Sequence, residues 1–183
     1  DELAATYGVA SYIEGWAAHF FDADNDGRQD LYLVDGAFSN LLYRNVPSGP
    51  WPEIGGASGA GISGTKRSLA IADFDDDGRI DILQPREFVP STFLRNTSPP
   101  SHWLKIATQG TRSNRDGIGA RISVTTGGVT QRQTVRTGVG FLGGSDLRCH
   151  FGLGAAVQAD RVTILWPSGQ EQTFLNVAAN QIL

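Results

Sequence analysis

An acidic nine-residue motif occurs twice in this chain, and it constrains the fold more than any other feature. Residues 22–30 and 73–81 both follow the pattern D-x-D-x-D-G-x-x-D and lie 51 positions apart. Five like charges within nine residues, as in the second copy, repel one another strongly unless a cation neutralises them. Alternate carboxylates on a tight loop supply the several oxygen ligands that calcium requires. The motif therefore predicts two calcium sites, and the alternative is a solvated acidic turn that binds nothing.

The predicted ligands occupy the same positions in both loops. Carboxylates are expected at positions 1, 3, 5 and 9, and a backbone carbonyl at position 7. The first loop supplies Asp22, Asp24, Asp26, Asp30 and the carbonyl of Arg28. The second loop supplies Asp73, Asp75, Asp77, Asp81 and the carbonyl of Arg79. Gly27 and Gly78 at position 6 permit the sharp reversal of the chain. Asp76, at position 4, is expected to point away from its site.

The two loops differ from EF-hands in their last ligand and in their flanks. Position 12, where an EF-hand places a bidentate Glu, holds Leu33 in the first loop and Gln84 in the second. Short apolar runs rich in β-branched and aromatic residues flank the loops, at residues 16–21, 31–34, 68–72 and 80–83. Each loop is therefore expected to connect two strands.

The repeat extends beyond the loops. A shift of 51 residues also superposes residues 41–45 on 92–96, so that each unit is strand, loop, strand, turn and strand ending in Arg-Asn. The arrangement resembles the FG-GAP/VCBS repeats of integrin-type β-propellers, at about residues 14–46 and 65–97. That resemblance implies two blade-like units with calcium loops. Since a propeller needs at least about four blades to close, two units leave strand edges that another chain is able to pair with.

The sequence changes character after a Pro- and Ser-containing linker at residues 96–101. Turn signals separate expected strands at residues 102–108, 120–125, 129–136, 160–166 and 172–177. This pattern predicts a β-sandwich or barrel. The segments 110–121, 150–154, 160–162 and 166–169 resemble the ASPIC/UnbV domain, which commonly follows FG-GAP repeats in secreted proteins related to cartilage acidic protein. The resemblance implies no catalytic chemistry. We expect a repeat region over residues 1–100 and a β-domain over residues 101–183.

Cysteine and methionine usage bears on where the protein acts. The single cysteine, Cys149, excludes an internal disulfide and is expected to be a buried, inert thiol. Bound metal is one alternative means of stabilising a small extracellular module. The chain begins at Asp1 and contains no methionine, which fits a processed secreted protein or an excised segment. No apolar run reaches the ~20 residues of a membrane span. An extracellular, secreted location is expected, without membrane insertion.

Charge is distributed unevenly between the two halves. Residues 1–101 carry a net charge of −8 and residues 102–183 a net charge of +4. Two calcium ions would bring the total near zero, and near-neutral dipolar molecules tend to associate. The alternative is a solvated basic face made by Arg112, Arg115, Arg121, Arg132 and Arg136. An acidic chain without a recognised binding module is not expected to bind nucleic acid.

No catalytic arrangement is evident. His19, His102 and His150 are scattered and form no zinc-binding pattern, so each is expected to be structural. The clustered carboxylates have the spacing of a cation site rather than that of a general acid and base.

These observations predict a non-enzymatic, secreted, calcium-binding structural or adhesion module that forms homo-oligomers or filaments. Strand addition through residues 6–13 or 173–183 is the expected mode of assembly. Two alternatives remain open: a fragment of a larger propeller that binds an extracellular protein or glycan, and an accessory domain of a secreted hydrolase.

Overall fold

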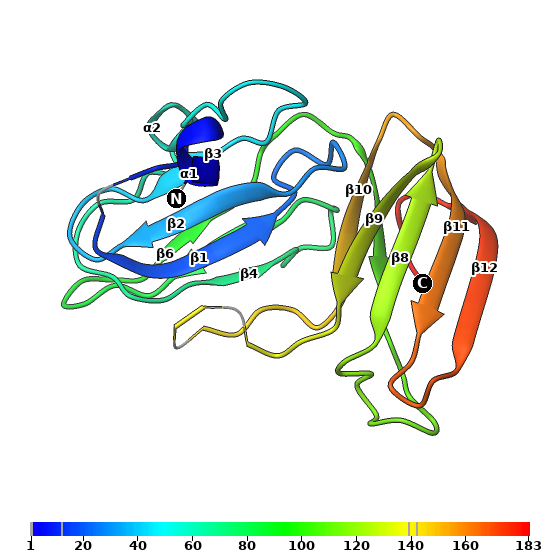
Figure 1. Cartoon of the computed structure of the whole chain (residues 1–183). Helices are drawn as coiled ribbons and strands as arrows, with labels where there is room; N and C mark the ends of the chain where they lie inside the picture. Colours follow the sequence, from blue (N-terminus) through cyan, green and yellow to red (C-terminus); the bar gives the residue numbers. More distant parts are fainter. Residues whose placement is uncertain (1, 12, 139, 142) are drawn as a thin grey trace.

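The regular structure of the chain is almost all β, with 39% of residues in strands and 4% in helices, which confirms the predicted all-β class. The computed structural model describes residues 2–11, 13–138, 140–141 and 143–183. The described residues form four open sheets, of which three have three strands and one has four. Figure 1 shows two of these sheets in the N-terminal half and two in the C-terminal half.

The N-terminal half contains two antiparallel three-stranded sheets in consecutive order along the chain. Unit 1 consists of β1 (Gly15–Phe21), β2 (Asp30–Asp35) and β3 (Leu41–Tyr43). Unit 2 consists of β4 (Ala70–Ala72), β5 (Asp81–Gln84) and β6 (Thr92–Leu94). A single-turn helix, α2 (Gly55–Ser58), lies between them in the sequence. In each unit the acidic loop joins the first two strands, as the repeat predicts.

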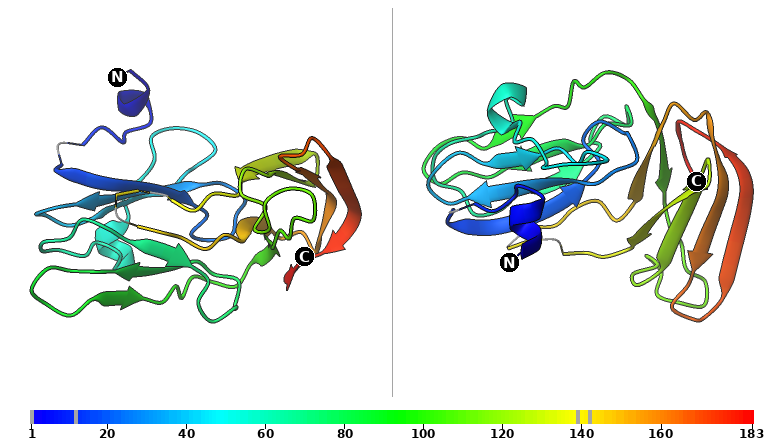
Figure 2. Two further views of the ribbon diagram at one scale, coloured as in Figure 1. Left: turned by 90° about the horizontal axis from the view of Figure 1, so that it is seen from below. Right: turned by 45° about the horizontal axis from the view of Figure 1, so that its top comes forward.

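The two units pack face to face. Alternate residues of a strand point to the same side of a sheet, and Phe21 and Tyr32 of unit 1 thus share one buried face. This face meets Leu69, Ile80 and Ile82 of unit 2 in one apolar core. The left view of Figure 2 shows the two sheets as stacked layers. The stacking brings the acidic ends of both hairpins to the same side of the N-terminal half.

The C-terminal half surrounds a second core. One sheet has the order β10-β7-β13 and the other β12-β11-β8-β9. The strands are β7 (His102–Ile106), β8 (Arg121–Thr126), β9 (Val129–Thr134), β10 (Cys149–Gly154), β11 (Gln158–Leu165), β12 (Glu171–Ala178) and β13 (Gln181–Ile182). Leu104, Val124, Phe151 and Val162 meet between the sheets. Cys149 is buried in the same core, where burial raises its pKa to about 12.

The connection between β9 and β10 reaches back to the repeat units. Phe141 contacts Trp16 of unit 1, with ring centroids 5.3 Å apart. The amide of Asp146 donates to the carbonyl of Ile71 in unit 2 at 3.3 Å. Figure 1 shows this connection as a yellow trace that extends from the C-terminal sheets beneath the N-terminal ones. The C-terminal half is therefore anchored to both units.

The strand expected over residues 6–13 is wrong. Helix α1 (Glu2–Thr6) occupies the start of the chain, and residues 9–11 and 13 belong to no strand, while residue 12 lies outside the described residues. Leu3 and the two alanines after it favour helix, and Gly8 ends the turn with a φ of 69°. At the other end, β12 and β13 are already paired with β11 and β7. Neither described helix is long and apolar enough to cross a membrane.

Candidate metal centre

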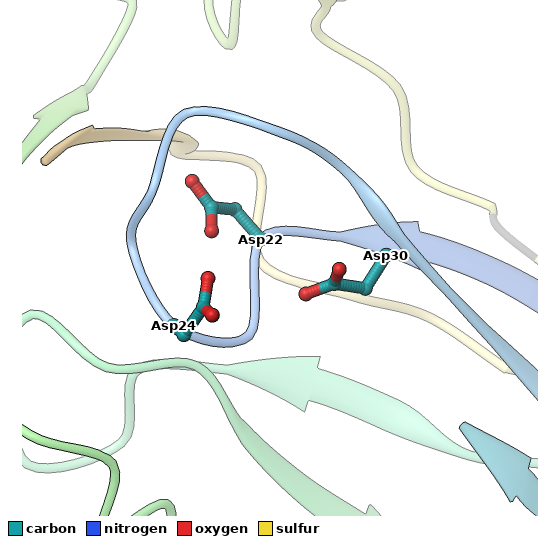
Figure 3. A group of neighbouring side chains, drawn as sticks. All are labelled: Asp22, Asp24 and Asp30. Atoms are coloured by element: carbon teal, nitrogen blue, oxygen red, sulfur yellow. The ribbon is translucent and has the colours of Figure 1, made fainter. Parts of the chain in front are cut away.

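Three carboxylates converge in the first acidic loop. Asp22 follows β1, Asp24 lies in the turn and Asp30 begins β2, so the hairpin brings positions distant along the loop together. One oxygen of each carboxylate lies within 4.8 Å of the others. Figure 3 shows the three groups directed toward one another inside the turn. This arrangement offers several oxygen ligands to one cation.

Backbone amides hold these carboxylates in place. The amides of Asp26 and Gly27 donate to the two oxygens of Asp22 at 3.0 and 2.8 Å. The amides of Ala23 and Asn45 donate to the two oxygens of Asp30 at 2.9 and 2.7 Å. Both side chains are thus oriented before any ligand arrives, and Asn45 at the end of the predicted repeat proves to be part of the loop's support.

The residues of the first loop fit a hard divalent cation. Burial raises the pKa of Asp22 to about 7 and that of Asp30 to about 6, and the neighbouring carboxylates add to both increases. Asp24 Oδ1 is buried without a hydrogen-bond partner. Burying a carboxylate oxygen without a partner is costly unless a cation contacts it. An oxygen-only donor set of this kind suits calcium or another hard cation rather than a soft metal.

The second loop repeats this geometry. Oxygens of Asp73, Asp75 and Asp81 also lie within 4.8 Å of one another. The amides of Asp77 and Gly78 donate to the oxygens of Asp73 at 3.0 and 2.7 Å. The amides of Phe74 and Asn96 donate to Asp81 at 3.2 and 2.7 Å. Every contact has its counterpart 51 residues earlier.

The predicted ligands at position 5 have arginine partners. Asp26 pairs with Arg28, and Asp77 pairs with Arg79. These two aspartates lie outside the three-carboxylate groups, so they and the carbonyls of Arg28 and Arg79 remain predicted ligands.

A further arginine, directly after the third strand of each unit, was not predicted at the sites. Arg44 pairs with Asp24 at 2.5 Å, and Arg95 pairs with Asp75 at 2.7 Å. The sequence signal for these residues is the repeated Arg-Asn at residues 44–45 and 95–96.

The two loops touch each other. Asn25 Nδ2 donates to the carbonyl of Gly78 at 2.8 Å, and Asn96 Nδ2 donates to the carbonyl of Ala23 at 2.8 Å. Asn25 is buried and adopts a left-handed φ of 58°. The loops therefore form one contiguous structure rather than two independent turns.

The C-terminal half contacts both loops as well. His150 Nε2 lies 2.9 Å from the carbonyl of Gly78, and burial lowers the pKa of His150 to about 4. Because a carbonyl only accepts, the neutral ring donates through Nε2. The amide of Gly154 donates to the carbonyl of Asn25 at 2.8 Å. We call the region where the first loop, the second loop, β7 and β10 meet the junction.

Buried Lys105 on β7 reaches the second loop at the junction. Its Nζ lies 2.7 Å from Asp73 Oδ2 and 2.5 Å from Asp76 Oδ1. Arg148 also contacts Asp76, at 3.1 Å. Asp76 lies outside the three-carboxylate group, and its hydrogen bond to Lys105 lowers its pKa.

Two family models match different parts of the chain. Residues 22–83 match the FG-GAP-like repeat, and residues 110–183 match the family described as ASPIC and UnbV. The two matches confirm the predicted order, an FG-GAP-like repeat followed by an ASPIC and UnbV domain. The FG-GAP-like match contains both acidic loops, and the ASPIC and UnbV match begins after β7. No curated protein matches the chain at a significant level.

Proposed function

We propose that this chain is a non-enzymatic, extracellular structural module whose two loops each hold one calcium ion. FG-GAP-like repeats often bind calcium and are typical of extracellular proteins. The observation that carries the proposal is the duplicated group of three carboxylates, two of them buried in each loop. Bound calcium would supply two positive charges to each group. We propose that Asp26 and Asp77 and the carbonyls at position 7 complete the coordination.

The chain's own residues perform three tasks in this proposal. Amides of the loops and of Asn45 and Asn96 orient the ligands. Arg44 and Arg95 pair with Asp24 and Asp75 and so offset part of the negative charge of each loop. Because the loops also contact β7 and β10 at the junction, ordering the loops stabilises the attachment of the ASPIC and UnbV domain. Calcium is thus proposed as a structural clamp.

Thermal unfolding with calcium and with a chelator tests this proposal. A ligand at a hundredfold excess over its Kd adds about 2.7 kcal/mol of stability per site. The double variant Asp24→Ala, Asp75→Ala should lose the calcium-dependent increase in Tm. Asp116→Ala, which removes an exposed aspartate far along the chain, should retain it. Identical melting curves for the wild type in calcium and in chelator would contradict the proposal.

One surface favours a second function, assembly between copies. Phe74 and Phe93 of unit 2 are 49% and 50% exposed, and their rings meet edge to face at 5.5 Å. Together with Leu83 they form what we call the open face. The residue equivalent to Phe93 in unit 1 is Leu42, and the one equivalent to Leu83 is Tyr32. Both are buried where unit 1 packs on unit 2. The open face is therefore built to receive another blade-like unit.

We propose that a second copy of the chain covers the open face with its own unit 1. The helix at residues 2–6 removes the predicted N-terminal donor strand, so sheet-on-sheet packing takes the place of strand addition. Phe93→Lys should lower the particle mass measured by light scattering in calcium. Val129→Lys, at a still more exposed apolar position on β9, should leave it unchanged. A wild-type chain that stays monomeric contradicts copy-to-copy assembly and favours a propeller unit, extracellular protein or glycan as occupant.

A further inference from the structure

The two acidic loops have the same local structure but different neighbours in the ASPIC and UnbV half. Each loop has its own pair of arginines, Arg28 and Arg44 in the first and Arg79 and Arg95 in the second. These contacts are related by the 51-residue repeat and therefore affect both loops alike. Within the loops themselves, position 4 differs in charge, Asn25 in the first and Asp76 in the second. The further difference comes from the residues that pack on them from outside the repeat.

The second loop faces a buried ammonium group. Lys105 is 1% exposed, and its Nζ lies 2.7 Å from Oδ2 of Asp73, the residue at position 1. The ammonium also lies 5.1 Å from the ring centroid of Trp103, which shields it from water. Asp73 thus has a permanent positive partner at one of its two oxygens.

The first loop faces a glycine instead. The residue at position 1 is Asp22, and Gly152 of β10 lies so close that an added Cβ would be 2.0 Å from Asp22 Oδ2. Gly152 pairs with Trp103 across the sheet, and Lys105 pairs with His150 two positions along. The same pair of strands therefore presents a cation to one loop and bare backbone to the other. Asp22 receives backbone amides but no lysine among the described residues.

We infer that Lys105 makes the two calcium sites unequal, with the first site tight and the second weakened by the lysine. This inference rests on the proposed calcium function. A calcium ion about 2.4 Å from Asp73 would lie within about 5–6 Å of the ammonium group, since both contact the same carboxylate. Two cations so close together in a partly dry site repel each other strongly. Among the described residues of the C-terminal half, no lysine competes in this way at the first site.

The inequality has a consequence for the junction. Lys105 already offsets part of the negative charge of Asp73 and Asp76. It therefore stabilises the second loop and its contact with β7 when calcium is scarce. The first loop has only calcium to neutralise its buried acids beyond the surface arginines. At intermediate calcium the first site fills and the second remains held by the lysine. The C-terminal half, through β7, thus sets the calcium threshold of the repeat that precedes it.

Calorimetric titration of single-site variants measures each affinity separately. Asp75→Ala leaves the first site and Asp24→Ala leaves the second, and we expect the first to bind calcium about tenfold or more tightly. Adding Lys105→Met to Asp24→Ala should tighten the second site by about tenfold. Adding Arg148→Met should change it by less than about twofold, because Arg148 contacts Asp76 and Asp146 but not Asp73.

The outcomes separate the inference from the proposed function. If neither site of the wild type binds calcium, the proposed function fails. If both bind with equal affinity, or Lys105→Met leaves the second site unchanged, calcium binding stands and the inference is overturned. Should Lys105→Met fail to fold, Lys105→Gln retains a donor to Asp73 without the charge. It must then tighten the second site for the inference to hold.

Discussion

Gly27 and Gly78 offer an internal comparison of how the junction constrains the second loop. Both are at position 6, and their φ angles are 89° and 87°, so alanine suffers the same backbone strain at either site. That strain is about 1–2 kcal/mol for a residue with a Cβ. The surroundings differ. A Cβ at position 27 would lie 3.4 Å from the end of the flexible Gln131 side chain, whereas one at position 78 would lie 1.8 Å from Trp103 Nε1.

We therefore expect Gly78→Ala to be clearly more destabilising than Gly27→Ala. Trp103 is 8% exposed and stacks against His150, with ring centroids 6.5 Å apart, so its indole has little room to move. Forcing extra volume into such a site costs about 1–3 kcal/mol. Gly27→Ala should thus cost about 1–2 kcal/mol and Gly78→Ala about 2–5 kcal/mol. In a chain of this size, the difference of about 2 kcal/mol lowers Tm by a further 4–8 °C or so.

Thermal unfolding followed by circular dichroism in saturating calcium measures both values. Combining each glycine variant with Trp103→Leu identifies the cause, because removing the indole should relieve the added cost of Gly78→Ala and leave that of Gly27→Ala unchanged. A coupling of about 1–2 kcal/mol is expected for position 78 and about zero for position 27. Equal costs for the two single variants, or additive double variants at position 78, would refute the role assigned to Trp103.

Two further predictions concern buried polar groups. Asn25→Asp should destabilise the chain by about 2 kcal/mol, because a carboxylate cannot donate a hydrogen bond to the Gly78 carbonyl. Asp tolerates the same left-handed backbone, so the backbone conformation is not the cause. An unchanged urea unfolding curve would contradict this prediction. In saturating calcium, Tm should rise as pH increases from about 4 to 6.5. Burial lowers the pKa values of His19 and His150 from 6.5 to about 4. In that interval the folded chain therefore binds fewer protons than the unfolded chain, and stability increases with pH. A Tm that falls over that interval would show that these rings are not held neutral.

Local spacing explains why the acidic loops were predictable. Within nine residues the position of each carboxylate depends mainly on the backbone turn. Alternating aspartates and a glycine at position 6 define that turn. The structure accordingly brings together Asp22, Asp24 and Asp30, and likewise Asp73, Asp75 and Asp81. The flanking strands followed from β-branched and aromatic residues in short runs. The N-terminal segment was not predictable in this way, because the alternation of apolar residues near Gly8 suggested a strand while the alanines before it formed a helix.

Tertiary structure alone decided which distant residues lie against each loop. Lys105, Trp103, His150 and Gly152 lie outside the repeat, and nothing in their local sequence marks them as neighbours of an acidic loop. They reach the junction because β7 and β10 pair in the C-terminal half and present their side chains to the preceding units. The sequence determined the ligands, since chelation is a property of a short turn. Charge compensation and packing depend on which distant strand lies against that turn, and only the assembled sheets fix that choice.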